Sequence, residues 1–312
     1  MTLETVGVQT AEVLTGDGVR LHAETVGPLD APVTVLLSHG WTCSTRSWHH
    51  QLTGLPAQLG DLVRVIAYDH RGHGLSDPAP AGTTTMDHLA RDLAEVIHAL
   101  VPDGPIVYAG HSMGGMTAMA LADLRPELVR DRFAGLTLVS TSAGQIASRP
   151  FGLPGRFDKT AAMIAPLVVT VAGRRADRRA RRAAVLGARE PTVPRVQRPA
   201  LRRAAFGRRP DPVEVDVLAA DVARTPGASL TGFFAALTDH DRGDALEVLA
   251  DLPVEVMHGT QDRLLSPRHA NRLAQLIPGA RLWMYPGAGH MLMQERPRDV
   301  TLRIAALARH AT

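Results

Sequence analysis

The chain has 312 residues, of which 45% are hydrophobic and 21% charged, and its formal net charge is +3. This composition excludes a wholly disordered chain and suits one large domain, or one domain with an insert. A single cysteine, Cys43, excludes an internal disulfide. Lys159 is the only lysine, which argues against Schiff-base catalysis.

The N-terminal residues MTLETVGVQTAEV lack the basic stretch and apolar core of a signal peptide. The longest apolar stretch, AAMIAPLVVTVAG at 161–173, contains Pro166 and is shorter than the roughly 18–20 residues that span a bilayer. We therefore expect a soluble, cytoplasmic protein.

In chain order, the first predicted unit is a hairpin of strands at 6–14 and 19–26, joined at Asp17-Gly18, a favourable turn pair. Further short runs rich in Val, Ile and Leu predict strands, and several are nearly continuous, as in strands covered on both faces. These runs are 33–38, 63–68, 105–110, 136–141, 254–259 and 280–285.

Helical patterns alternate with these strands. Residues 85–101 place apolar side chains close to a 3.6-residue period, and Thr85 can cap the first turn. The alternation predicts an α/β fold with a mostly parallel, doubly wound sheet and helices on both faces.

The alternation breaks between about 142 and 238, where the chain is rich in Pro, Gly and Arg and shows helical pieces without a clear strand. We therefore expect residues 1–141 and 239–312 to form the two parts of the sheet domain. Residues 142–238 are expected to form a helical cap, or lid, inserted over the sheet.

The stretch YAGHSMGGM, at 108–116, places Ser112 between Gly110 and Gly114. A G-x-S-x-G match alone is weak, but a predicted strand enters it and a predicted helix leaves it, as in a nucleophile elbow. Such a turn strains the serine backbone, and side chains at 110 and 114 would clash with neighbouring segments. The N–H groups that follow Ser112 begin a helix, where negative charge is favoured.

A serine nucleophile needs a base, and the base needs an orienting carboxylate. His290, in YPGAGHMLMQERP, follows the last predicted strand, and Asp262, in VEVMHGTQDRLLSP, follows the strand before it. The rival carboxylates Asp239, Asp241 and Asp244 lie in DHDRGDALEVLADL, which reads as a helix leading into a strand. The earlier strand end, LTLVSTSAG, offers no carboxylate.

Together these motifs resemble the α/β-hydrolase fold superfamily, in its capped, esterase- and lipase-like serine hydrolases. The matching stretches are LLSHGWTCSTRSW, VIAYDHRGHGLSD, AGHSMGG, HGTQDRLLSP and GAGHMLMQERP. The resemblance covers roughly 20–140 and 239–305 and implies a catalytic triad of Ser112, Asp262 and His290.

The resemblance also implies an oxyanion hole made of two backbone N–H groups. One follows the nucleophile, at Met113, and the other lies in the loop after the third strand, at Trp41. Such donors contribute on the order of 3 kcal/mol each to transition-state stabilisation.

Other chemistry-bearing residues near these motifs have structural interpretations. We expect His39 and His111 to be hydrogen-bonded scaffold residues, and DHRGHGLSD, at 69–77, to brace the loop after its strand. Cys43 is expected to be a small packing residue.

The segment 174–209 is rich in arginine. This composition has three interpretations: a solvated helical face, contact with an anionic membrane surface or substrate, or nucleic-acid binding. Nucleic acid is disfavoured because no aromatic residues are interleaved with the arginines. The sequence leaves the oligomeric state open.

The expected activity is hydrolysis of a carboxylic ester of a moderately apolar small molecule, because FGLPGRF (151–157), AAMIAPLVV (161–169) and TGFFAAL (231–237) would line an apolar pocket. Alternatives for the same triad are a lactone, a thioester, the C–C bond of a diketone, or cofactor-free perhydrolysis. A non-enzymatic alternative is a ligand-binding receptor on a hydrolase scaffold. Epoxide hydrolases and dehalogenases are disfavoured, since they use a carboxylate where this chain has Ser112.

No cofactor is needed for this chemistry, and no residue spacing indicates a metal site. The adjacent pair His49-His50 alone is too weak a signal for one.

Overall fold

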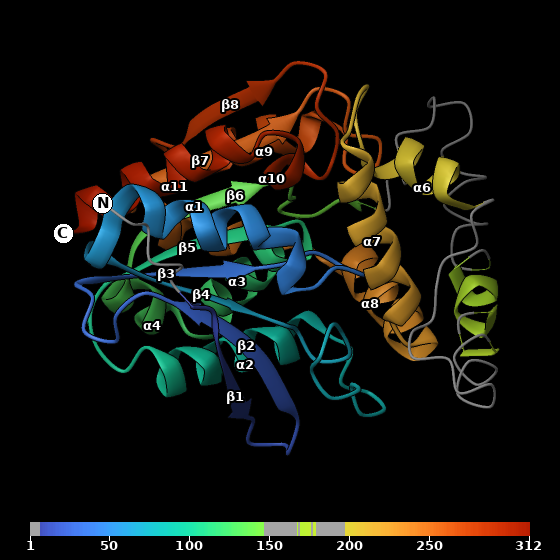
Figure 1. The fold of residues 1–312 in the computed structure, drawn as a ribbon, viewed down its shortest axis with the longest axis horizontal. Coiled ribbons are helices and arrows are strands. Elements are labelled where there is room, and N and C mark those ends of the chain that lie inside the picture. Colours follow the sequence, from blue (N-terminus) through green and yellow to red (C-terminus); the bar gives the residue numbers. More distant parts are fainter. Residues whose placement is uncertain (1–6, 147–166, 168, 176, 179–196) are drawn as a thin grey trace.

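The computed structural model describes residues 7–146, 167, 169–175, 177–178 and 197–312. Its centre is one eight-stranded sheet in the order β1-β2-β4-β3-β5-β6-β7-β8 (Figure 1). Strands β3 to β8 are parallel, and the hairpin β1–β2 adds an antiparallel edge. The strands are β1 Gln9–Leu14, β2 Arg20–Val26, β3 Val33–Ser38, β4 Val63–Tyr68, β5 Ile106–His111, β6 Phe133–Val139, β7 Val254–Gly259 and β8 Arg281–Tyr285. The predicted mostly parallel sheet and N-terminal hairpin are therefore confirmed.

Most predicted strands agree with the structure within one residue, but two do not: the strand predicted at 6–14 begins only at Gln9, and the strand predicted at 136–141 is displaced. Strand β6 begins at Phe133 and ends at Val139. It starts early because α4 (Pro126–Arg132) runs directly into it and the ring of Phe133 stacks on Tyr108 of β5, with ring centroids 5.6 Å apart.

The central strands are buried on both faces, which explains their nearly continuous apolar runs. Leu36 of β3 and Tyr108 of β5 belong to one core, whereas their neighbours Val35 and Val107 belong to the other. All four are fully buried. Alternate side chains of one strand thus fill two separate hydrophobic cores.

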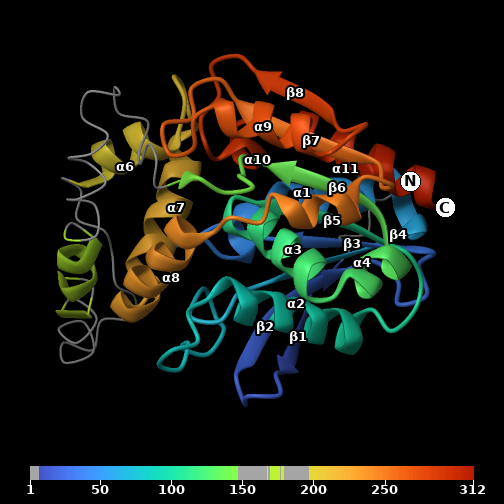
Figure 2. The same ribbon diagram turned by 180° about the vertical axis from the view of Figure 1, so that it is seen from behind.

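Helices complete these two cores on opposite faces of the sheet (Figures 1 and 2). One face carries α2 (Met86–Leu100), α3 (Met113–Leu124) and α9 (Arg268–Leu276), and the other α1 (His49–Leu59), α10 (Leu292–Glu295) and α11 (Pro297–Ala311). Thr85 caps α2 as predicted, because its Oγ1 accepts the backbone N–H of His88 at 3.2 Å.

Three helices lie together beyond the end of the sheet at which the parallel strands terminate (Figures 1 and 2). They are α6 (Arg198–Ala205), α7 (Pro212–Arg224) and α8 (Gly227–Asp239). A polar contact joins α7 to the short helix η1 (Thr45–Trp48): Ser44, the N-cap of η1, donates its hydroxyl to Asp221 at 2.8 Å.

The helix predicted in DHDRGDALEVLADL is shorter than expected. The structure has only a 3-10 helix, η7, at Asp244–Leu249. Gly243 and Pro253 bracket this segment and leave little room for a longer helix. Residues 151–157, most of 161–169 and most of the arginine-rich 174–209 lie outside the described residues. In the described part of the last segment, Arg198 pairs with Asp216 at 2.5 Å.

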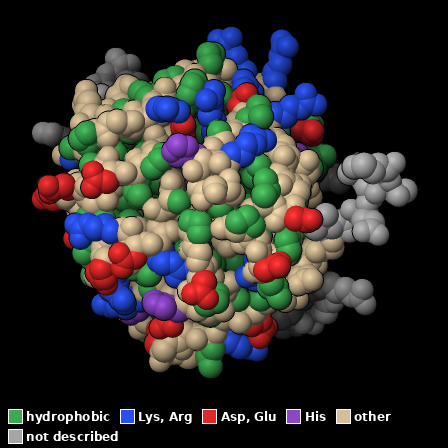
Figure 3. All heavy atoms as spheres, turned by 90° about the vertical axis from the view of Figure 1, so that its left-hand side faces the viewer, with side chains coloured by type: hydrophobic (Ala, Val, Ile, Leu, Met, Phe, Trp, Pro, Cys, Tyr) green, Lys and Arg blue, Asp and Glu red, His purple; other side chains and the backbone are tan. Residues whose placement is uncertain are grey.

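The molecular surface opposite α6–α8 carries interspersed Arg, Asp and Glu side chains, as on an ordinary solvated face (Figure 3). Among the described residues, no helix combines the length and apolar character needed to cross a membrane.

Four buried histidines lie near the ends of β3, β4 and β5 at the same edge of the sheet: His39, His70, His73 and His111. Burial lowers the pKa of each imidazole below its usual value, to about 3 for His70 and about 4 for His73. The hydrogen bonds of His39 also indicate a neutral imidazole. Its Nε2 accepts the backbone N–H of His70 at 3.0 Å, and its Nδ1 donates to Gly40 O at 2.8 Å. Only the neutral ring can do both.

We predict that acid destabilises the protein through these histidines. Below pH 6.5 the unfolded chain takes up protons that the folded chain excludes, which costs about 2 kcal/mol per histidine by pH 5. Three buried carboxyls with pKa raised to about 6 oppose this by about 1 kcal/mol each. They are Asp69, Asp92 and Asp221. The histidines prevail, so denaturant titrations should give a free energy of unfolding several kcal/mol lower at pH 5.0 than at pH 7.5. Equal values would contradict this account.

Candidate active site

Ser112 occupies the tight turn between β5 and α3. Its φ of 50° and ψ of −113° lie in a region that non-glycine residues rarely adopt, and such strain costs on the order of 1–3 kcal/mol. Flanking hydrogen bonds hold it: Ser112 N–H donates to Val139 O at 2.9 Å, and Thr141 Oγ1 donates to Ser112 O at 2.6 Å. The end of β6 thus fixes the serine backbone from both sides.

The glycines around Ser112 are required by close approach of the backbone. A Cβ atom at Gly110 would lie 2.5 Å from the backbone N of Gly115, and one at Gly114 would lie 2.3 Å from the backbone O of Ser38. The clash expected from the sequence at both positions is therefore present.

Asp262 lies three residues beyond the end of β7, and its side chain is fully buried. Its Oδ1 accepts the backbone N–H groups of Leu264 and Leu265, both at 2.9 Å, while Oδ2 faces His290 Nδ1 at 2.7 Å. Burial favours the neutral carboxyl, but the attraction and hydrogen bond of His290 and the other partners outweigh it, so the pKa of Asp262 is lowered. The carboxylate stays ionised and holds the imidazole.

His290 lies in the loop between β8 and α10 and is 5% exposed. Because the Asp262 carboxylate only accepts hydrogen bonds, His290 Nδ1 carries the proton and Nε2 carries the free lone pair. The ring of His290 lies 4.8 Å from that of His111, the residue before Ser112.

The His290 loop is held by His111, which the sequence predicted as a hydrogen-bonded scaffold residue, and by Ala205 and Glu295, which the sequence did not single out. His111 Nε2 contacts the backbone O of His290 at 3.1 Å, and His290 N–H donates to Ala205 O of α6 at 2.8 Å. Glu295 accepts the N–H groups of Gly289 and Gly207, both at 2.8 Å, and so joins this loop to the segment after α6. No local motif marks these contacts, because each joins residues distant in the chain or depends on backbone atoms.

A second histidine lies close to the Asp262 carboxylate. His258, at the end of β7, places Nε2 3.3 Å from Asp262 Oδ2 and 2.9 Å from Leu265 O. Burial lowers its pKa, so the ring is neutral and acts as a donor. Its spacing of four residues from Asp262 was the sequence signal that could have identified it.

Ser112 and His290 open on the same cavity, of about 280 Å³. Its other walls are almost entirely apolar and come from both the sheet domain and the three helices beyond it. They include Trp41, Met116, Leu201, Leu218, Val222, Leu230, Phe234 and Leu237. Helices α6, α7 and α8 therefore supply much of the wall that faces Ser112.

Of the two expected oxyanion donors, Trp41 lines this cavity, and Met113 is the buried first residue of α3. Cys43 also lines the cavity, but burial raises the pKa of its thiol and keeps it protonated, in line with a packing role. The brace expected at 69–77 is present: Asp69 accepts the N–H groups of Thr45 and Leu75 at 2.7 and 2.8 Å.

Comparison of the sequence with known protein families shows the family of this chain. The family model described as alpha/beta hydrolase fold matches residues 33–297. The chain belongs to this family. A bifunctional esterase/perhydrolase of Acinetobacter calcoaceticus is 42% identical to this hydrolase over 103 residues, and the match spans only about a third of either protein, 33% of this chain and 35% of that relative.

Two longer matches cover nearly the whole hydrolase. A non-heme chloroperoxidase of Streptomyces lividans is 30% identical over 296 residues, which are 91% of this chain and 94% of that protein. The solved structure of a thermophilic esterase from Thermogutta terrifontis superposes with a TM-score of 0.69 at 27% identity, covering 97% of this chain and 99% of that one.

We predict that Gly114→Ala disturbs the Ser112 turn. The new Cβ would force β3 and α3 apart, so the free energy of unfolding should fall by about 1–3 kcal/mol. Gly243→Ala is the matched control, because its nearest heavy atom would be 3.6 Å away. Denaturant titrations of both variants check this, and equal stabilities would show that the turn relaxes freely.

Proposed function

We propose that the protein is a serine hydrolase that cleaves a carboxylic ester of a moderately apolar acid through Ser112, His290 and Asp262. The observation that carries the proposal is the 2.7 Å contact of His290 with an ionised, buried Asp262, beside an apolar cavity that Ser112 also lines. A base held in one tautomer next to a strained serine is the arrangement that acyl transfer requires.

In the proposed reaction, Ser112 Oγ attacks the ester carbonyl carbon while His290 Nε2 takes the hydroxyl proton. Asp262 stabilises the resulting imidazolium without accepting its proton. The tetrahedral intermediate collapses, and His290 gives its proton to the departing alkoxide. Water then attacks the acyl-enzyme with His290 again as the base, and the carboxylic acid leaves as Ser112 regains its proton.

The proposed oxyanion donors are the backbone N–H groups of Met113 and Trp41. Met113 begins α3, where helical N–H groups favour negative charge. The loop carrying Trp41 passes close to the nucleophile, since a Cβ at Gly40 would lie 3.2 Å from Ser112 Cβ. Both donors are backbone groups, so the shape of the loop matters more than its side chains.

We assign α6–α8 as part of a cap over the sheet domain, within the 142–238 insert. Leu230, Phe234 and Leu237 of α8 line the cavity beside Ser112, which supports an apolar acyl group as the part of the substrate bound there.

Perhydrolysis is a second candidate, favoured by the relative named as a bifunctional esterase/perhydrolase and by the non-heme chloroperoxidase match. Hydrogen peroxide would replace water as the attacker of the acyl-enzyme and release a peracid. Peracid formation from an ester and peroxide, lost in Ser112→Ala, would support it.

We predict that a fluorophosphonate probe labels the wild type and not Ser112→Ala. Turnover of p-nitrophenyl esters should rise about fourfold in kcat/KM per added methylene until the acyl chain fills the cavity, because each buried methylene contributes about 0.8 kcal/mol. Labelling that persists in Ser112→Ala would remove this residue from its role. Labelling without ester turnover would favour C–C hydrolysis or the receptor alternative.

We also predict that Asp262→Asn lowers kcat by about 10⁴-fold, because an amide cannot hold His290 in the tautomer that accepts the Ser112 proton. Ester hydrolysis measured beside thermal unfolding separates this from a folding defect. The control is Asp244→Asn, an exposed carboxyl in η7 that should leave kcat unchanged. An unaffected rate in Asp262→Asn would mean that another group supports the base.

A further inference from the structure

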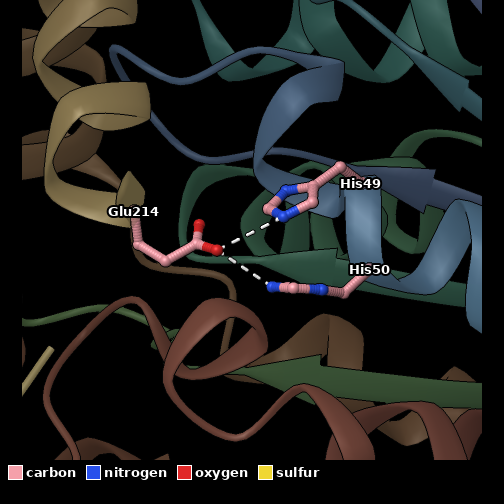
Figure 4. A group of neighbouring side chains, drawn as sticks. All are labelled: His49, His50 and Glu214. Carbon is pink, nitrogen blue, oxygen red and sulfur yellow. Dashed lines mark hydrogen bonds and ion pairs between the residues drawn. The ribbon is translucent and has the colours of Figure 1, made fainter. Parts of the chain in front are cut away.

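A polar cluster lies where the first helix of the sheet domain meets α7. His49 and His50 begin α1, and Glu214 lies in the first turn of α7 (Figure 4). None of the three lines the cavity that holds Ser112. One donor atom from each residue lies within 4.8 Å of the others.

Both histidines point the same nitrogen at one carboxylate oxygen (Figure 4). Nε2 of His49 is 3.3 Å from Glu214 Oε1, and Nε2 of His50 is 2.9 Å from it. Tetrahedral ligands 2.0–2.1 Å from a zinc ion are about 3.4 Å apart. The first separation already matches this spacing, and the second needs to lengthen by about half an ångström.

The position of the His49 hydrogen requires a cation, either a proton or a metal ion, between this ring and Glu214, and Glu214 accordingly raises the pKa of His49. Its Nδ1 lies 2.8 Å from Arg46 O, and a carbonyl oxygen only accepts, so Nδ1 carries the hydrogen. In the neutral ring, Nε2 then presents a lone pair to the Glu214 carboxylate. Two acceptors that face each other repel unless a proton or a cation lies between them. A backbone carbonyl on the second nitrogen is also the usual support of a metal-bound histidine.

Glu214 provides a second, independent indication. The residue is 5% exposed, and its Oε2 is buried with no hydrogen-bond partner among the described residues. A buried, unpaired carboxylate oxygen is costly, and a bound cation would compensate its charge. The histidines are about 40% exposed, which leaves a path for an ion from solvent.

We propose that His49, His50 and Glu214 bind a divalent transition-metal ion of the zinc class, which fastens α7 to α1. Two imidazole nitrogens and one carboxylate oxygen suit zinc, with water as the fourth ligand. Because α7 also supplies Leu218 and Val222 to the cavity, the ion would hold one wall of that cavity in place. The proposal does not depend on the catalytic roles assigned above.

Calorimetric titration of the full chain with zinc chloride at pH 7.5 tests this site. We expect one ion per chain, and at least tenfold weaker binding in each of His49→Gln, His50→Gln and Glu214→Gln. The control His310→Gln removes an exposed histidine of α11 and should bind as the wild type does. Magnesium chloride should give no comparable binding, since magnesium prefers oxygen ligands.

Thermal unfolding provides a second test that still works if a variant is less stable than the wild type. The unfolding midpoint of each protein with zinc is compared with the midpoint of the same protein without zinc. At about 100 times the dissociation constant, zinc should raise the midpoint of the wild type by about 4 °C. It should also slow amide hydrogen exchange in 212–224. An unchanged midpoint, or equal shifts in wild type and the three variants, would overturn the proposal and leave an ordinary ion pair between α1 and α7.

Discussion

The tight packing of the β5–α3 turn against β3 and β6 is the constraint on which the site depends. Ser112 keeps a strained φ of 50° because Val139, Thr141 and the α3 backbone hold its peptide groups. The absence of side chains at Gly110 and Gly114 lets β3 and α3 approach this turn within contact distance. A hydroxyl so fixed faces the cavity without relaxing into the sheet.

Electrostatics around this turn follow from burial. The histidines near the strand ends are neutral because water cannot solvate their charge, whereas Asp262 remains ionised because His290 Nδ1 and the N–H groups of Leu264 and Leu265 donate hydrogen bonds to it. The buried Asp262 carboxylate lies next to neutral imidazole rings and only accepts hydrogen bonds. It therefore favours the His290 tautomer that carries its proton on Nδ1. The proposed base is thereby kept in the tautomer that the reaction requires.

Three of the polar contacts between described residues illustrate how the helices beyond the sheet are joined to the rest of the protein. They are Ser44 with Asp221, the His49–His50 pair with Glu214, and Glu295 with Gly207 and Gly289. The last of these also orders the His290 loop. Helix α6 therefore contributes both to the apolar cavity wall and to the support of the proposed base, so a movement of α6 would displace the His290 loop.

The sequence by itself determined the strand order of appearance, the parallel sheet, the cap of α2 at Thr85 and the clashes at Gly110 and Gly114. These depend on local patterns: apolar runs, helical periodicity and the steric demands of one turn. The pairing of Asp262 with His290 was also anticipated, because parallel strands end at a common edge and bring their following loops together.

Only the tertiary structure decided the rest. No periodic pattern in the sequence indicates that Ala205 and Glu295 support His290. The same holds for the contact of His49 and His50 with Glu214, which lies 164 residues after His50. The early start of β6 was likewise set by packing, of Phe133 against Tyr108. Contacts between distant segments depend on how whole helices dock, and docking is governed by the summed packing of many side chains that no single stretch of sequence contains.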